Sequence, residues 1–374
     1  MIGIARGDNT VVGRWWWTVD RSLLAALLGL MAIGLVLVII ASPGVAERID
    51  APTFHFVKRH LLLLPLAAAL MIGCSLMTPR QTRMAALLLL CGAVVALAAT
   101  MVVGVEIKGA RRWIPLGGFS LQASEFAKPA MAVLAAWMLT QYRRRGSYGY
   151  LAAALLVFGA PLGLTAIQPD VGTSVVMTVV FCAQIFIAGV SLWVAGLMAG
   201  AAIGGFGLAY LYVPHVTDRV NRFLDPAAGD TYQIDMSLNA FRAGGLVGRG
   251  PGDGVIKGAL PDAHSDFIFA VAGEEFGLIA CLFIIAVFAF IVLRALFKAL
   301  SDGDLFAMLA VGGLASLFGA QALVNLGSTL ALIPTKGMTL PFVSYGGSSL
   351  FAIAIGMGFA LALTRKRANH GGFE

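Results

Sequence analysis

The chain has 374 residues, of which 59% are hydrophobic and only 12% are charged. Soluble domains carry about 25% charged residues, so this composition excludes a water-soluble fold. The formal net charge of +7 does not indicate a nucleic-acid partner, because the basic residues stand singly or in short clusters at the ends of apolar runs. The composition therefore predicts a multi-pass membrane protein.

Apolar stretches of spanning length follow one another along the chain. A helix needs about 20 mainly apolar residues to cross the hydrocarbon core of a bilayer, and the sequence contains about ten such stretches. We therefore expect an all-α polytopic membrane protein, with a transmembrane domain at 22–364 between terminal segments 1–21 and 365–374. The predicted spans are 22–42, 60–78, 83–104, 124–141, 150–167, 171–189, 191–213, 267–297, 304–331 and 344–364.

The distribution of basic residues predicts the orientation. An even number of spans puts both termini on one side of the membrane. With both ends in the cytoplasm, the inner loops and tails hold more lysine and arginine than the short outer loops, including the clusters at 143–145 and 365–367. We expect an N-in, C-in topology.

The longest interruption, residues 214–265, is predicted to be an extracytoplasmic loop between the seventh and eighth helices. Loops of this length are uncommon and usually carry function. Within it, Ile234, Leu238 and Phe241 have the spacing of an apolar stripe on a short helix. The glycine-rich stretch 248–254 lacks the GK[ST] ending of a phosphate-binding P-loop, which favours a flexible turn.

Four polar segments mark candidate sites, because ionisable groups in or beside a spanning helix are costly. In the first, Glu125 and Lys128 stand three residues apart and share one face of the predicted fourth helix. A structural salt bridge and a direct substrate role both remain open for this pair. Arg112, beside Trp113 at the predicted outer interface, is suited to phosphate binding, with interfacial anchoring as the alternative.

The second segment is Gln168-Pro-Asp170, at a tight outer turn between two predicted helices. Asp170 can cap the helix that follows, and capping alone accounts for it.

The fourth segment, 334–349, is polar and bracketed by prolines. Irregular backbone at membrane depth has to be buried in protein or line a cavity. Lys336 in this segment is suited to neutralising a phosphate, and extension of its side chain to the interface is the alternative.

The third segment, 260–277, is the densest acidic region of the chain, with Asp262, His264, Asp266, Glu274 and Glu275. Capping of the next helix needs one such residue and leaves the others unexplained. The positive end of that helix would keep Asp266 ionised, which suits a base or a metal ligand. One histidine without thiolates is a poor zinc site, whereas Mg²⁺ or Mn²⁺ could use these oxygen ligands.

Together, the four segments resemble the SEDS family of peptidoglycan glycosyltransferases, which includes FtsW, RodA and SpoVE. The stretches that carry the resemblance are ARRWIPLGGFSLQASEFAK, QPDVGTS, LPDAHSDFIFAVAGEEFG and PTKGMTLPFVSYGGSS. The last two are closer to the FtsW branch than to the RodA branch. The resemblance implies polymerisation of lipid II at the outer face of the inner membrane, at the division septum. The implied partners are an FtsI-type class B penicillin-binding protein and other divisome proteins.

The resemblance also implies a catalytic role for Asp266. In the implied reaction, a sugar hydroxyl must lose its proton while it attacks a donor that carries a pyrophosphate leaving group. We expect Asp266 to accept the proton, while cationic groups or a divalent cation stabilise the leaving group. Two alternatives stay open, a lipid II flippase and a non-catalytic divisome scaffold. Supporting roles are assigned to Glu125, Lys128, Arg112, Trp113, Lys336, His264, Glu275, Gln168 and Asp170.

Overall fold

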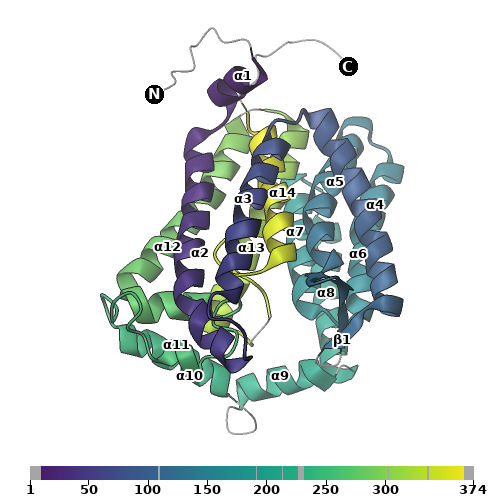
Figure 1. Ribbon diagram of the computed structural model, residues 1–374. Coiled ribbons are helices and arrows are strands. Elements are labelled where there is room, and N and C mark those ends of the chain that lie inside the picture. Colours follow the sequence, from purple (N-terminus) through teal and green to yellow (C-terminus); the bar gives the residue numbers. More distant parts are fainter. Residues whose placement is uncertain are drawn as a thin grey trace.

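The computed structural model describes residues 10–107, 110–190, 192–212, 214–225, 231–301, 303–334 and 337–365. Its long helices run side by side in one bundle (Figure 1). Each of the predicted apolar stretches overlaps one of them. These helices are α2 (Arg21–Arg48), α3 (His55–Ser75), α4 (Pro79–Val103), α5 (Ala123–Arg145), α6 (Tyr148–Ile167), α7 (Val171–Ile187), α8 (Leu192–Tyr212), α12 (Ile268–Ser301), α13 (Leu305–Thr329) and α14 (Gly347–Leu363).

Several of these helices are candidate membrane spans by their length and composition. Within the described ranges, six are long and apolar enough to cross a bilayer, namely α2, α3, α4, α6, α12 and α13, and α7 and α14 are shorter apolar helices. The predicted class, a helical multi-pass membrane protein, is confirmed. The number of crossings and their sidedness stay predictions.

Helix α5 lies inside the bundle and contacts α4, α6, α7, α13 and α14. Its side chains from Ala127 to Ala136 are all buried, and five of them are alanines. Small side chains allow helix backbones to approach closely in a membrane, where van der Waals packing drives association. This central position brings the first turn of α5, with Glu125, under the segments that precede α12 and α14.

A three-stranded antiparallel sheet precedes α5 and was not predicted. It consists of β1 (Val105–Ile107), β2 (Ala110–Leu116) and β3 (Phe119–Leu121), in that order. Gly117 and Gly118 connect β2 to β3 with φ of 50° and 97°. Positive φ at both central residues is the requirement of a type I′ hairpin turn, which favours glycine. The Gly-Gly pair was therefore the pattern that could have revealed the hairpin.

The predicted outer segment contains helices α9 (Pro214–Leu224), α10 (Tyr232–Gly244) and α11 (Ile256–Ala259), at the end of the bundle opposite α1 (Val11–Thr18) (Figure 1). The expected short helix over 234–241 is confirmed as part of α10. The fully buried residues of α10, however, are Ser237, Ala240 and Gly244 instead of the apolar stripe. A Cβ on Gly244 would lie 1.9 Å from the carbonyl oxygen of Gly273, so glycine here lets α10 pack closely on α12.

Helix α12 is interrupted at Gly277, whose φ of 74° breaks the predicted continuous span. The N–H groups of Leu278 and Ile279 donate to the carbonyl oxygens of Gly245 and Leu246, at 2.9 and 3.2 Å. Broken helices are tolerated at membrane depth when protein satisfies the freed backbone groups. The first part of α12 is therefore a half-helix that starts just after Asp266.

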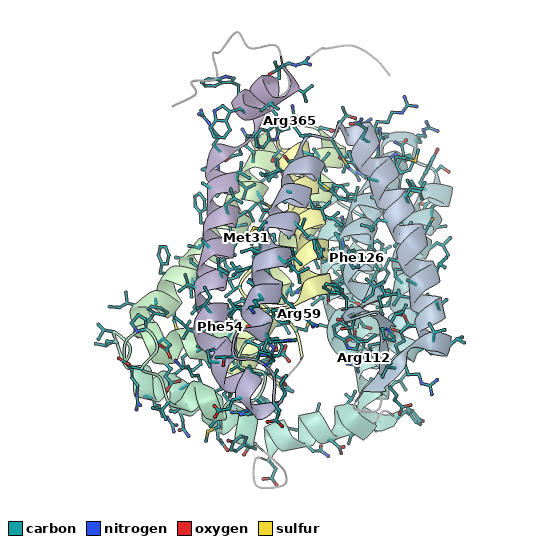
Figure 2. The ribbon with its side chains drawn as sticks, in the orientation of Figure 1. Met31, Phe54, Arg59, Arg112, Phe126 and Arg365 are labelled. Carbon is teal, nitrogen blue, oxygen red and sulfur yellow. The ribbon has the colours of Figure 1, made fainter. Side chains whose placement is uncertain are left out.

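At the other end, α1 docks against the last residues of the described chain. The indole N–H of Trp15 donates to Ser75 Oγ at 2.8 Å, and Arg365 Nε donates to Thr18 Oγ1 at 3.0 Å. The predicted N-terminal segment thus contains a helix, and α1 and Arg365 lie at the same end of the bundle (Figures 1 and 2). The side of the membrane on which this end lies stays a prediction.

Candidate functional site

A polar cavity of about 400 Å³ lies where β2, β3, the start of α5 and the segments before α12 and α14 meet. Figure 2 shows the labelled Arg59 and Arg112 in the half of the bundle toward α9 and α10. The charged and aromatic side chains that line the cavity are Arg59, Arg112, Trp113, Phe119, Glu125, Asp262, Asp266 and Tyr345. The structure thus brings residues of three predicted polar segments, distant in sequence, into one space.

Asp266 lies in the turn that leads into α12, two residues before its first residue. The positive end of the half-helix favours the ionised carboxylate at this position. Its Oδ2 atom lies close to Gly337, where an added Cβ would be 3.3 Å away. Asp266 therefore faces the stretch that follows Lys336, across one wall of the cavity.

The expected pair of Glu125 and Lys128 is confirmed as a buried salt bridge, with Nζ and Oε1 separated by 2.7 Å. Lys128 also donates to Gln321 Oε1 at 2.9 Å and is 1% exposed. Glu125 lines the cavity, whereas Lys128 lies in the layer beneath it. The second carboxylate oxygen, Glu125 Oε2, is buried and accepts no hydrogen bond from the described residues. The described residues therefore leave the acceptor capacity of this oxygen unused.

Part of the Arg112 guanidinium group is hydrogen-bonded to backbone carbonyl oxygens. Its Nε donates to the carbonyl oxygen of Gln168 at 3.3 Å, and its Nη2 donates to that of Pro169 at 2.5 Å. These bonds hold the 168–170 turn against the sheet. Because a guanidinium group has five N–H donors, the contacts leave donors that can face the cavity.

Gln168 and Asp170 do not line this cavity. The amide of Gln168 donates to Leu97 O at 2.8 Å, and Asp170 caps α7 by accepting from the N–H of Thr173 at 3.4 Å. Their substrate-supporting role stays a prediction; in the structure both residues hold the turn between α6 and α7. Asp170 instead borders an adjoining, mostly apolar cavity of about 250 Å³.

Glu275 also lies outside the cavity, and its supporting role stays a prediction. Its carboxylate accepts from the N–H of Gly254 at 3.2 Å and from Lys257 Nζ at 2.5 Å. The neighbouring Glu274 accepts from the N–H groups of Val255, Ile256 and Lys257 at 2.7, 2.7 and 2.8 Å. The two buried glutamates therefore hold the glycine-rich stretch and α11 against α12.

Replacing Glu274 with glutamine should lower the midpoint of thermal unfolding, measured by intrinsic fluorescence in detergent. The amide keeps one acceptor oxygen in place of two charged ones, and each hydrogen bond to a charged group contributes about 1.5–3 kcal/mol. Glu106→Gln, which removes a carboxylate from an ion pair more than half exposed on both sides, is the control. Equal midpoints for the two variants would contradict a structural role for Glu274.

His264 packs in an aromatic cluster instead of lining the cavity, and its supporting role also stays a prediction. Its ring lies 4.2 Å from that of Phe56 and 5.3 Å from that of Tyr345, centroid to centroid. Burial lowers the pKa of His264 to about 4, against a smaller opposing effect of Asp262. The imidazole is therefore neutral at pH 7 and supports the wall behind Tyr345.

His264→Phe should flatten the pH dependence of unfolding. In the wild type, the unfolded chain takes up a proton at His264 below pH 6.5 while the folded chain does not until about pH 4. Stability is therefore lost as pH falls through this window, by up to about 1.4 kcal/mol per pH unit. Thermal unfolding midpoints at pH 7 and pH 5 measure the effect. An identical drop in both proteins would contradict it.

Lys336 lies outside the described residues, so its predicted role stays a prediction. Its neighbours Gly337, Met338 and Thr339 line the cavity. The predicted binding of a divalent cation has little support. The described part of the chain contains no group of three or more His, Cys, Asp or Glu side chains that could hold one. These residues do not fit a metal site built by the protein alone.

The sequence analysis missed Arg59, Tyr345 and two amides of α13. Gln321 and Asn325 are each 1% exposed and stand one turn apart beneath the cavity. Both lie within a predicted apolar span, and a polar side chain in such a span was the pattern that could have revealed them. Only ionisable groups were weighed there.

Comparison with known proteins covers nearly the whole chain. Residues 20–369 match the FtsW/RodA/SpoVE family, described as cell cycle proteins. The probable peptidoglycan glycosyltransferase FtsW of Caulobacter vibrioides is 45% identical over 365 residues, covering 97% of this chain and 93% of the relative. The same protein of Coxiella burnetii is 35% identical, covering 94% and 98%.

Two solved structures share the fold. A chain of a peptidoglycan synthase complex, whose structure concerns the coordination of polymerization and crosslinking, superimposes with a TM-score of 0.74 at 27% identity, covering 93% of this chain and 98% of that one. The rod shape determining protein RodA of Thermus thermophilus gives a TM-score of 0.68 at 27% identity, covering 93% and 97%. The four polar segments, the helical bundle and these full-length matches agree, and the chain belongs to the FtsW/RodA/SpoVE family.

Proposed function

We propose that this protein is a peptidoglycan glycosyltransferase that polymerises lipid II into glycan strands, with Asp266 as the general base. The observation that carries the proposal is the single cavity lined by the carboxylates of Asp266 and Glu125 and by the guanidinium groups of Arg59 and Arg112. A base and cationic groups in one space are what glycosyl transfer from a pyrophosphate-linked donor requires.

In the proposed reaction, the acceptor hydroxyl attacks the anomeric carbon of the donor sugar. The new carbon–oxygen bond forms as the bond from that carbon to the pyrophosphate oxygen breaks, and the hydroxyl proton passes to Asp266. Direct displacement converts an α-linked donor into a β-1,4 linkage without a covalent enzyme intermediate. Arg112 and Arg59 stabilise the negative charge on the departing pyrophosphate.

The septal assignment rests on the relatives, which are named FtsW. The partner assignment rests on the similarity to a complex that coordinates polymerization and crosslinking. We infer that this chain works at the division septum of the cytoplasmic membrane, beside an FtsI-type class B penicillin-binding protein. That partner crosslinks the glycan strands that this chain makes.

A flippase is less well supported by the bundle. Translocation of a polar headgroup needs polar groups along the whole depth of a pathway. Beneath Lys128, the central helix α5 carries only apolar side chains from Pro129 to Leu139. The described ionisable groups of α5 lie at the two ends of the helix. This distribution favours a reaction at one face of the membrane over passage of a polar headgroup through the bundle.

Reconstitution separates these functions. Purified protein and its transpeptidase partner are placed in liposomes with labelled lipid II, and glycan length and headgroup translocation are scored in parallel. We expect polymer without added translocation. Translocation without polymer would support a flippase, and neither activity, with assembly of the complex intact, would support a scaffold.

A further inference from the structure

Helix α13 carries two amide side chains, Asn325 and Gln321, on adjacent turns beneath the cavity. Each amide donates a hydrogen bond to a backbone carbonyl oxygen of the 338–339 stretch. Asn325 Nδ2 donates to Asp266 O at 2.8 Å and to Met338 O at 2.7 Å. Both protons of this amide are therefore used. One side chain fixes the turn that holds Asp266 relative to the 338–339 stretch, which also lines the cavity.

Gln321 makes the equivalent connections one turn earlier. Its Oε1 accepts from Lys128 Nζ at 2.9 Å, and its Nε2 donates to Ser349 Oγ at 3.1 Å and to Thr339 O at 3.3 Å. Lys128 in turn holds Glu125. The same helix therefore touches both halves of the cavity, Asp266 through Asn325 and Glu125 through Gln321.

The spacing of the two contacts is fixed by the helix itself. Four residues of α-helix rise about 6 Å, and α13 is packed against α5, α7, α12 and α14. Asp266 lies in irregular backbone before α12, and irregular backbone has more conformational freedom than a helix. A rigid helix with two inward amides removes that freedom at the point where geometry matters for reaction.

We propose that Asn325 and Gln321 are positioning residues that set the distance between Asp266 and the Glu125–Lys128 pair. The inference rests on the proposed function, since it assigns the two amides to the same reaction. Neither amide is assigned a contact with substrate. Asn325 acts through the backbone of Asp266, and Gln321 acts through Lys128.

A purely structural role is the competing explanation, because buried amides commonly satisfy backbone carbonyls. The chain contains a matched case in Gln184 on α7. It is fully buried, and its Nε2 donates to Ala132 O at 2.6 Å and to Leu309 O at 3.1 Å. These contacts join helices away from the cavity, so Gln184→Leu removes the same kind of interaction without touching the site.

The test compares Asn325→Leu with Gln184→Leu in the complex with the transpeptidase partner, with rates expressed per folded molecule. We expect Asn325→Leu to lower kcat by about 10²-fold, the cost of a misplacement of about 1 Å, with KM for lipid II changed less than twofold. Gln184→Leu should keep the wild-type kcat. If Asn325→Leu does not fold, Asn325→Ser, which keeps one donor, should give a smaller loss of kcat with the same KM.

Hydrogen exchange supplies a readout that does not depend on activity. Amides of the 262–267 turn and of 338–340 should exchange faster in Asn325→Leu and not in Gln184→Leu. Unchanged exchange at the turn overturns the inference whatever the rates are, and so does an equal loss of kcat in both variants. If Asp266→Asn polymerises normally, the proposed base fails, and faster exchange in Asn325→Leu still supports the positional role of Asn325.

Discussion

Asp266→Asn should lower the kcat of lipid II polymerisation by about 10³-fold, because a positioned general base typically contributes 10²- to 10⁴-fold. Asparagine has nearly the same shape and keeps the backbone contact to Asn325 Nδ2, which is made by the carbonyl oxygen. The loss would therefore report the missing proton acceptor. The measurement is the length and amount of glycan formed from lipid II in the reconstituted complex.

Asp262→Asn is the matched control, since Asp262 is a second carboxylate that lines the same cavity. Its backbone has a φ of 54°, in the left-handed region that asparagine tolerates as well as aspartate does. We expect the control to keep activity within a few-fold of wild type. Normal polymerisation by Asp266→Asn, or an equal loss in both variants, would contradict the assignment of Asp266 as the base.

Lys128→Met should destabilise the folded protein by about 3–5 kcal/mol, because it leaves the Glu125 carboxylate buried without its counter-ion. The salt bridge is almost fully enclosed, with side-chain exposures of 2% for Lys128 and 7% for Glu125. The double variant Glu125→Gln, Lys128→Met removes both charges and should recover most of the stability. Unfolding midpoints of the single and double variants in detergent measure this difference.

Activity of the double variant separates the two interpretations of the pair. If the salt bridge only stabilises the bundle, the folded double variant should polymerise lipid II at close to the wild-type rate. Because Glu125 lines the cavity and its Oε2 accepts no hydrogen bond from the described residues, we expect the double variant to be folded and strongly impaired in polymerisation. A double variant as unstable as Lys128→Met would contradict the expected effect of the unpaired charge.

The spans and the Glu125–Lys128 pair could be predicted because they depend on local patterns. An apolar run of sufficient length has few alternatives to a membrane helix, and residues three apart on a helix share a face. Glu275 lies apart from the cavity for a physical reason. Although it follows Asp266 closely in sequence, nine residues of largely helical backbone separate the two by roughly 13 Å, and its carboxylate serves the glycine-rich stretch.

Other parts of the site depend on contacts between distant segments, which no local pattern encodes. Arg59 joins the cavity because α3 packs against α14, and a Cβ on Gly358 would lie 2.5 Å from Cys74 Cβ where the two helices meet. Asn325 matters because its helix passes beneath two irregular segments. An amide carries no charge, so the cost that marks an aspartate in a membrane is smaller for it.

The two irregular segments are joined so closely that they form a single wall. Beyond the bonds of Asn325, Tyr345 N donates to His264 O at 2.9 Å, and Ser344 Oγ donates to Ser265 O at 2.5 Å. A polymerase that adds one disaccharide per cycle has to move its product along before the next substrate enters. Because these hydrogen bonds tie the two segments together, we expect the wall to stay fixed during each step and the facing β2–β3 hairpin to make room for the growing strand.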